Sequence, residues 1–168
     1  MEHPDENIQE DGMGLKAGEK APDVTLPSHD DQQVALSTLW KDGPAVLLFF
    51  PLAFTSTCTE ELCNVRDDIG AYTGLNANVA AISVDSPYVL KRFRDEVGAP
   101  YAFLSDFNRE ASTAFGVLRS SPLGPGLLNA SDRAAFVIGP DGTIRYAWHE
   151  TRPWLLPPFD EIKAALSN

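Results

Sequence analysis

Apolar and polar positions along the chain follow two periods, one typical of strands and the other typical of helices. The segment 45-AVLLFF-50 is apolar at every position, which is typical of a strand buried on both faces. Between Leu62 and Ile69 apolar residues recur at helical spacing, which predicts a helix from about Thr57 to Ile69. The segment 79-VAAISV-84 then predicts another strand. This part of the chain therefore predicts a strand–helix–strand unit.

The remaining segments continue the alternation. We expect short strands at 23–26 and 34–36, a strand that enters a turn at 102–107, and further strands at 134–139 and 143–148. We expect helices at 87–97, 109–117 and 157–166. The turn 140-PDG-142 is a strong hairpin signal, whereas 118–131 is rich in Pro, Gly and Ser and predicts a loop. This order predicts an α/β chain with a thioredoxin-like fold, in which helices flank a central mixed sheet and an N-terminal β-hairpin is added.

Composition divides the chain into a tail and one domain. Residues 1–14 hold five carboxylates and no Lys or Arg, so we expect an acidic, mobile tail. Residues 15–168 are long enough to form a single domain around one core without a disulfide or a metal. The cysteines are therefore available for chemistry.

The charge and the apolar segments restrict the possible partners and location. The net charge is −11, from 13 basic and 24 acidic residues, which disfavours binding to nucleic acid or to anionic lipid. No apolar segment reaches the roughly 18 residues that span a bilayer, so we expect no membrane insertion. Two cysteines and no recognisable signal peptide favour a reducing, cytoplasmic location.

Cys58 and Cys63 are the only cysteines, and both lie in the predicted helix. Cys58 is near its start, where free backbone N–H groups and the helix dipole stabilise a thiolate, so we expect a lowered pKa and a nucleophile. Five helical residues place the two Cα atoms roughly 8–9 Å apart, beyond the usual disulfide range of about 4.4–6.8 Å. A disulfide between them therefore requires the helix to unwind. Packing without reactivity is an alternative for either cysteine, above all for Cys63.

A metal site is a weaker interpretation of the same residues. The usual zinc spacing is Cys-x2-Cys, whereas this chain has Cys-x4-Cys. The three histidines, His3, His29 and His149, form no local cluster of ligands in the sequence. We therefore expect no metal.

The segment 51-PLAFTSTC-58 resembles the Pro-x3-Thr/Ser-x2-Cys signature of the peroxiredoxins, which are thiol peroxidases of the thioredoxin fold. Segments 18–39, 80–87, 104–117 and 133–148 also resemble peroxiredoxin segments in the same order, so the resemblance covers about residues 15–166. Within the family, 49-FFPLAFT-55 is similar to the alkyl hydroperoxide reductase E branch. In contrast, 58-CTEELC-63 has the cysteine spacing of the PrxQ or bacterioferritin comigratory protein branch.

The resemblance implies a role for each matching residue. Cys58 becomes the peroxidatic cysteine, Thr55 the hydroxyl that orients the peroxide, and Pro51 the shield over the pocket. Arg133, which precedes a predicted core strand, matches the arginine that reaches the thiolate, and Glu61 matches the acid that holds this arginine. From the residues alone, a surface charge at a strand start is the favoured interpretation of Arg133, and a helix cap is the interpretation of Thr55.

The resemblance also implies a catalytic cycle. Hydrogen peroxide or an organic hydroperoxide oxidises Cys58 to a sulfenic acid, and Cys63 resolves it as an intramolecular disulfide. Thioredoxin or a glutaredoxin-like dithiol then returns the electrons. No metal, haem or flavin cofactor is implied, and related proteins occur as monomers or homodimers.

Three alternatives remain open at this point. A one-Cys peroxidase would use an external thiol to resolve Cys58 and leave Cys63 as packing. A thioredoxin-type disulfide reductase shares the fold but requires Cys-x2-Cys, and a thioredoxin-fold copper chaperone would use Cys-x3-Cys with a distant histidine. The observed spacing fits neither of the last two.

Overall fold

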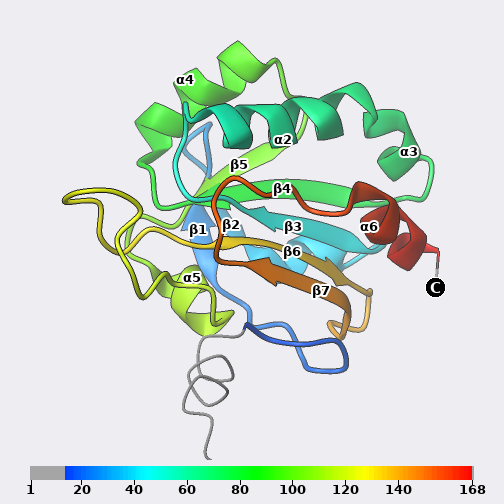
Figure 1. The fold of residues 1–168 in the computed structure, drawn as a ribbon. Helices are drawn as coiled ribbons and strands as arrows, with labels where there is room; N and C mark the ends of the chain where they lie inside the picture. The colour runs from blue at the N-terminus through cyan, green and yellow to red at the C-terminus, as the bar shows by residue number, and fades with distance from the viewer. Residues whose placement is uncertain (1–13, 168) are drawn as a thin grey trace, which may run out of the picture.

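The computed structural model describes residues 14–167 (Figure 1). The predicted tail, 1–14, lies outside the described residues except for Gly14. The backbone nitrogen of Gly14 donates a hydrogen bond of 3.0 Å to Nδ1 of His149. Gly14 is therefore in contact with the domain.

The centre of the fold is a five-stranded sheet. Its strands are β3 (Ala45–Phe49), β4 (Asn78–Ser83), β5 (Ala102–Ser105), β6 (Arg133–Ile138) and β7 (Ile144–Glu150), arranged in the order β5-β4-β3-β6-β7. β3 runs parallel to β4 and antiparallel to β6, so the sheet is mixed, as predicted. The predicted N-terminal hairpin is also present, formed by β1 (Thr25–Pro27) and β2 (Gln33–Ala35).

Helices cover both faces of the sheet (Figure 1). They are η1 (Leu36–Trp40), α2 (Ser56–Asp67), α3 (Ile69–Thr73), α4 (Pro87–Val97), α5 (Glu110–Ala114) and α6 (Phe159–Leu166). Alternate residues of β3 enter two separate cores: Val46 and Leu48 pack with α2, α4 and α6, whereas Leu47 and Phe49 pack with η1, α5 and the hairpin. The strand is buried on both faces for this reason. None of the helices between residues 14 and 167 is long and apolar enough to cross a bilayer.

One local prediction is wrong, and one element was missed. The helix expected to run to Ile69 ends at Asp67, because Asp68 has non-helical backbone angles (φ −113°, ψ 20°) and the separate helix α3 follows. The side chain of Asp68 is held instead by Lys163 of α6. The 3-10 helix η1 was not predicted, and its start is fixed by Asp23, whose carboxylate accepts hydrogen bonds from the backbone and hydroxyl of Ser37 at 2.9 and 2.7 Å.

Candidate active site

The loop between β3 and α2 is held in a sharp turn. The backbone nitrogen of Ala53 donates a 2.8 Å hydrogen bond to the carboxylate of Asp85, which follows β4. Phe54 has a φ of 68°, an uncommon value for an aromatic residue, and its ring lies 4.9 Å from that of Phe93 on α4. The contacts with Asp85 and Phe93 fix the path by which the chain enters α2.

Cys58 is the third residue of α2 and is 1% exposed. The backbone N–H groups of Thr57 and Cys58 belong to the first turn, where the helix offers no acceptor to them. Thr55 precedes the helix, but its side chain makes no capping bond to it; its hydroxyl donates to the carbonyl of Leu52 at 3.0 Å. Thr55 therefore occupies the N-cap position without capping the helix through its side chain, and it also lines the cysteine pocket.

Arg133 begins β6 and reaches across to α2. Its Nη1 lies 3.3 Å from Sγ of Cys58 and 2.7 Å from Oε1 of Glu61. Its Nη2 donates a 2.6 Å hydrogen bond to the carbonyl oxygen of Pro153. Arg133 is 1% exposed, so its interpretation as a surface charge is wrong. The structure brings the cysteine, the arginine and the acid into one buried cluster.

Burial controls the ionisation of this cluster. Glu61 is fully buried, which raises the pKa of its carboxyl group to about 7 although the charge of Arg133 acts in the opposite direction. Burial also raises the pKa of the Cys58 thiol, while Arg133 and the hydroxyl of Thr55 lower it. The position of Cys58 at the helix start predicted a lowered thiol pKa, and this prediction is wrong in direction for the closed pocket. Desolvation of the thiolate outweighs the favourable charges.

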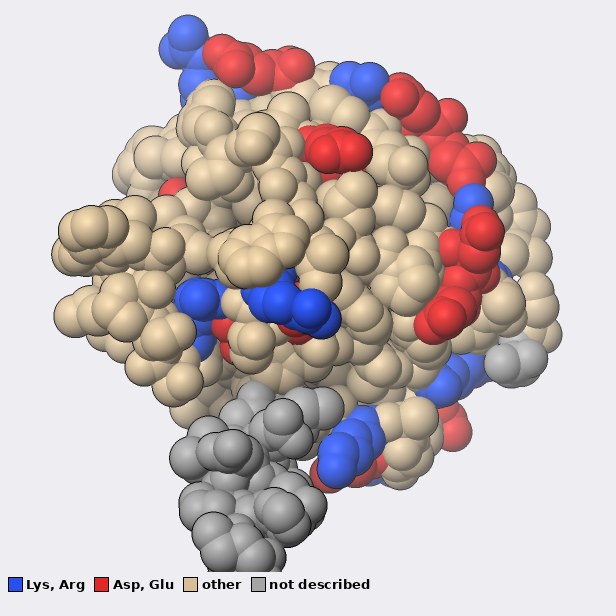
Figure 2. Space-filling model, in the orientation of Figure 1, with Lys and Arg blue, Asp and Glu red and all other residues tan. Residues whose placement is uncertain are grey.

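Above Cys58 lies a pocket of about 250 Å³, and the residues that line it are Pro51, Thr55, Ser56, Thr57, Cys58, Leu123, Arg133, Pro153 and Trp154. Leu123, Pro153 and Trp154 form an apolar wall that the sequence did not indicate. They lie in irregular segments, where no periodic pattern marks a buried or functional position. Figure 2 shows an uncharged projection on the left of the molecule, where Figure 1 places the loop that contains Leu123; residues 120–130 have no charged side chain.

Cys63 lies further along α2, partly buried against the core cluster that contains Cys58. Both cysteines are free thiols. Because α2 is continuous from Ser56 to Asp67, helix geometry separates the two Cα atoms by roughly 8–9 Å, as expected from the sequence. Within residues 14–167, no group of three or more His, Cys, Asp or Glu side chains could hold a metal ion.

The comparison with known proteins identifies the family. The model of the AhpC/TSA family matches residues 17–147. Peroxiredoxin Bcp of Escherichia coli K12 is 32% identical over 81% of the chain and 86% of its own length. The chain is a peroxiredoxin of the AhpC/TSA family. A Mycobacterium tuberculosis protein whose name assigns it to the peroxiredoxins is 35% identical over 82% of the chain and 87% of its own length.

Solved structures agree with this peroxiredoxin assignment. Peroxidoxin BcpB from Mycobacterium tuberculosis superposes with a TM-score of 0.80 at 30% identity, over 91% of this chain and 97% of that one. A peroxiredoxin-like protein from Aquifex aeolicus gives a TM-score of 0.82 at 25% identity, over 93% and 88%. The predicted thioredoxin-like fold and the predicted resemblance to the Bcp branch are confirmed. As a peroxiredoxin the chain is a thiol-dependent peroxidase, which argues against the disulfide-reductase and copper-chaperone alternatives.

Proposed function

We propose that Cys58 is the peroxidatic cysteine and that it reduces hydrogen peroxide and organic hydroperoxides. The observation that supports this most strongly is the position of Cys58 Sγ, 3.3 Å from Nη1 of Arg133 and at the base of a pocket of about 250 Å³. The thiolate attacks one peroxide oxygen and the O–O bond breaks. The sulfur becomes a sulfenic acid, and the other oxygen leaves as water or an alcohol after taking up a proton.

The surrounding residues supply the donors that this reaction requires. Negative charge develops on the departing oxygen, and the first-turn N–H groups of α2 and the guanidinium of Arg133 are positioned to stabilise it. The hydroxyl of Thr55 can add a third donor once it rotates away from the carbonyl of Leu52. Glu61 holds Arg133 in place through the 2.7 Å ion pair. Pro51 shields the pocket from water. Arg133 has three partners for its planar fork, which a flexible ammonium group could not contact together.

The apolar wall of the pocket supports the use of organic hydroperoxides. Leu123, Pro153 and Trp154 line the same pocket as the polar groups of Thr55 and Arg133. A hydroperoxide would place its oxygens on the polar side and its hydrocarbon group against the apolar side. Burial of that group would then contribute binding energy that hydrogen peroxide cannot provide.

We further propose that Cys63 resolves the sulfenic acid within the same chain. The thiol of Cys63 attacks the Cys58 sulfur, a disulfide forms, and water is released. Part of α2 must unwind first, since the intact helix holds the two residues apart. Thioredoxin or a glutaredoxin-like dithiol then reduces the disulfide by thiol–disulfide exchange. In the alternative one-Cys cycle an external thiol attacks Cys58 directly.

The cellular setting follows from this chemistry. Dithiol reductants are kept reduced in the cytoplasm, and we propose that the enzyme acts there.

Residues 15–168 act as a single domain, either as a monomer or as a homodimer.

Replacement of Cys58 tests the proposed role. Cys58→Ser should abolish peroxide turnover with a dithiol reductant, while the circular dichroism spectrum and melting temperature remain close to those of the wild type. Cys63→Ser provides the matched control, because it should still react once with peroxide. Substantial peroxidase activity in Cys58→Ser would overturn the assignment.

A further inference from the structure

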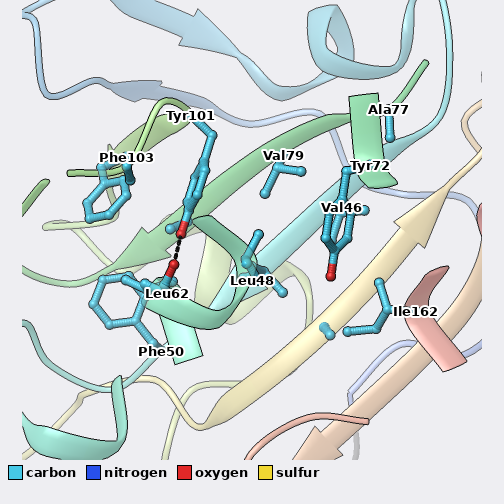
Figure 3. Packing of buried hydrophobic residues seen from close by; sticks show 14 of the residues in the cluster. Val46, Leu48, Phe50, Leu62, Tyr72, Ala77, Val79, Tyr101, Phe103 and Ile162 are labelled. Carbon is cyan, nitrogen blue, oxygen red and sulfur yellow. Dashed lines mark hydrogen bonds between the residues drawn. The ribbon is translucent and has the colours of Figure 1, made fainter. Parts of the chain in front are cut away.

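Tyr101 connects helix α2 to the sheet at a position beside Cys63. It immediately precedes β5, and its hydroxyl donates a buried hydrogen bond of 2.7 Å to the carbonyl oxygen of Leu62 (Figure 3). Leu62 is the residue before Cys63 and lies on the buried face of α2. The bond therefore joins segments that are 39 residues apart, at the part of the helix that has to move for a disulfide to form.

The tyrosine itself is firmly held. Its backbone carbonyl accepts a 2.8 Å hydrogen bond from Nε of Arg94 on α4, and its ring lies 5.6 Å from that of Phe103. Only 6% of Tyr101 is exposed. Burial raises the pKa of its hydroxyl well above the ordinary value, so the group remains a hydrogen-bond donor. Tyr101 cannot follow Leu62 when α2 unwinds, and the bond between them must break.

A second contact, made by Arg66, also holds α2 to a neighbouring helix. Nη1 of Arg66, one turn beyond Leu62, donates to the carbonyl of Val97 at the end of α4. The helix is thus held to its neighbours at Leu62 and at Arg66, while Cys58 lies one turn before the first of these anchors. Unwinding that brings Cys63 toward Cys58 would release the Leu62 anchor first.

We propose that Tyr101 sets the rate at which Cys63 captures the oxidised Cys58, by holding α2 closed at the carbonyl of Leu62. This inference rests on the proposed function, in which Cys63 is the resolving residue. Tyr101 is a positioning residue, since it touches neither the peroxide nor the sulfurs. The step that it controls converts the Cys58 sulfenic acid and the Cys63 thiol into a disulfide and water, with no other reactant.

The hydrogen bond acts on the fate of the sulfenic acid rather than on its formation. Before oxidation, α2 keeps Cys58 in its pocket without this bond as well, because a variant that lacks the Tyr101 hydroxyl retains the helix and its anchor at Arg66. After oxidation, a closed helix prolongs the lifetime of the sulfenic acid, which a second peroxide can then oxidise to the sulfinic acid. Loss of the Tyr101 hydroxyl should therefore speed resolution and reduce overoxidation, without slowing the first attack.

Tyr101→Phe tests this proposal with a minimal change. The variant keeps the ring, and the Leu62 carbonyl keeps its donor within the helix, so no buried group loses its only partner. The rate of disulfide formation after one equivalent of peroxide can be measured by acid quench and mass spectrometry. In the variant this rate should be about five-fold higher than in the wild type, which is the effect expected from the loss of one hydrogen bond. The rate constant for the first attack should remain unchanged, and less sulfinic acid should form under excess peroxide.

Tyr72→Phe is the matched control. Tyr72 is buried in the same core cluster but lies on α3, and among residues 14–167 its hydroxyl has no hydrogen bond to α2. The control should resolve at the wild-type rate. Equal acceleration in both variants would show general loosening of the core and would overturn the role of Tyr101.

Cys63→Ser separates this inference from the proposed function. If Cys63→Ser blocks disulfide formation but Tyr101→Phe resolves at the wild-type rate, the role of Tyr101 is wrong and the proposed cycle stands. If Cys63→Ser cycles normally with thioredoxin, Cys63 does not resolve and both proposals fall. Slower peroxide attack in Tyr101→Phe would also overturn the inference, since the hydroxyl would then act on the pocket.

Discussion

The negative charge of Glu61 should raise the pKa of the Cys58 thiol, even though Glu61 also positions Arg133, which stabilises the thiolate. Both groups contact Nη1 of Arg133, at 2.7 Å for the carboxylate oxygen and 3.3 Å for the sulfur. One cation therefore serves two acids in a buried site. Ionisation of either acid opposes ionisation of the other, and the pair titrates as a coupled system.

Glu61→Gln isolates this effect because glutamine retains an oxygen that can accept the hydrogen bond from Arg133. Since both acids contact the same nitrogen, they lie no more than about 6 Å apart, and two charges at that distance repel by about 3 kcal/mol at an effective dielectric constant of about 20. A negative charge raises the pKa of a neighbouring thiol, so its removal should lower the pKa of Cys58, by up to about 2 units.

The pH dependence of Cys58 alkylation measures this pKa directly, in a Cys63→Ser background so that only one thiol reacts. Glu60→Gln is the control, because Glu60 precedes Glu61 in α2 but is exposed. It should leave the profile almost unchanged. An unchanged or higher pKa of Cys58 in Glu61→Gln would refute the reasoning, and would mean that the ion pair with Arg133 matters more to the thiolate than the carboxylate charge.

Three further predictions concern neighbouring groups. Arg133→Lys keeps the charge but loses the planar fork, so stopped-flow measurements should show peroxide attack slowed about 100-fold, and a wild-type rate would remove Arg133 from the site. Leu123→Ala should lower kcat/KM for tert-butyl hydroperoxide about 10-fold relative to hydrogen peroxide, whereas an equal effect on both would contradict the apolar wall. Because the pKa of Glu61 is raised from 4.5 to about 7, its stabilising contribution is complete below pH 4.5 and is lost as the pH rises through about 7. In denaturant titrations the free energy of unfolding of the wild type should therefore fall by about 3 kcal/mol relative to Glu61→Gln across that range, and parallel pH profiles would contradict the raised pKa.

Local signals explain which elements the sequence could predict. The helix expected at 87–97 coincides with α4, because the hydroxyl oxygen of Ser86 caps it by accepting a hydrogen bond from the backbone nitrogen of Val89, and Gly98 ends it with a positive φ of 73°. In contrast, η1 and the break at Asp68 depend on side chains distant in the sequence. No local pattern could indicate these contacts.

Some features of the active site could likewise be predicted from the sequence, and others could not. The motif around Cys58 is visible in the sequence, and the resemblance to the peroxiredoxins indicated Arg133, which the residues alone did not; the structure brings both residues together. The carbonyl of Pro153, which binds Arg133, is a backbone group and has no signature in the sequence. The direction of the Cys58 pKa shift was missed because it depends on the degree of burial, which helix position alone does not determine.

The mass of the protein after one equivalent of hydrogen peroxide tests the proposed cycle most directly. The proposal predicts that the wild type loses two hydrogens, that peptide mapping finds Cys58 joined to Cys63 within one chain, and that Cys63→Ser gains one oxygen on Cys58 instead. The mass of the Cys58→Ser variant should not change after the same treatment with hydrogen peroxide. A wild-type protein that gains oxygen without forming a disulfide, or that forms only Cys58–Cys58 dimers, would contradict resolution by Cys63, and oxidation of Cys63 in Cys58→Ser at the wild-type rate would contradict the role of Cys58.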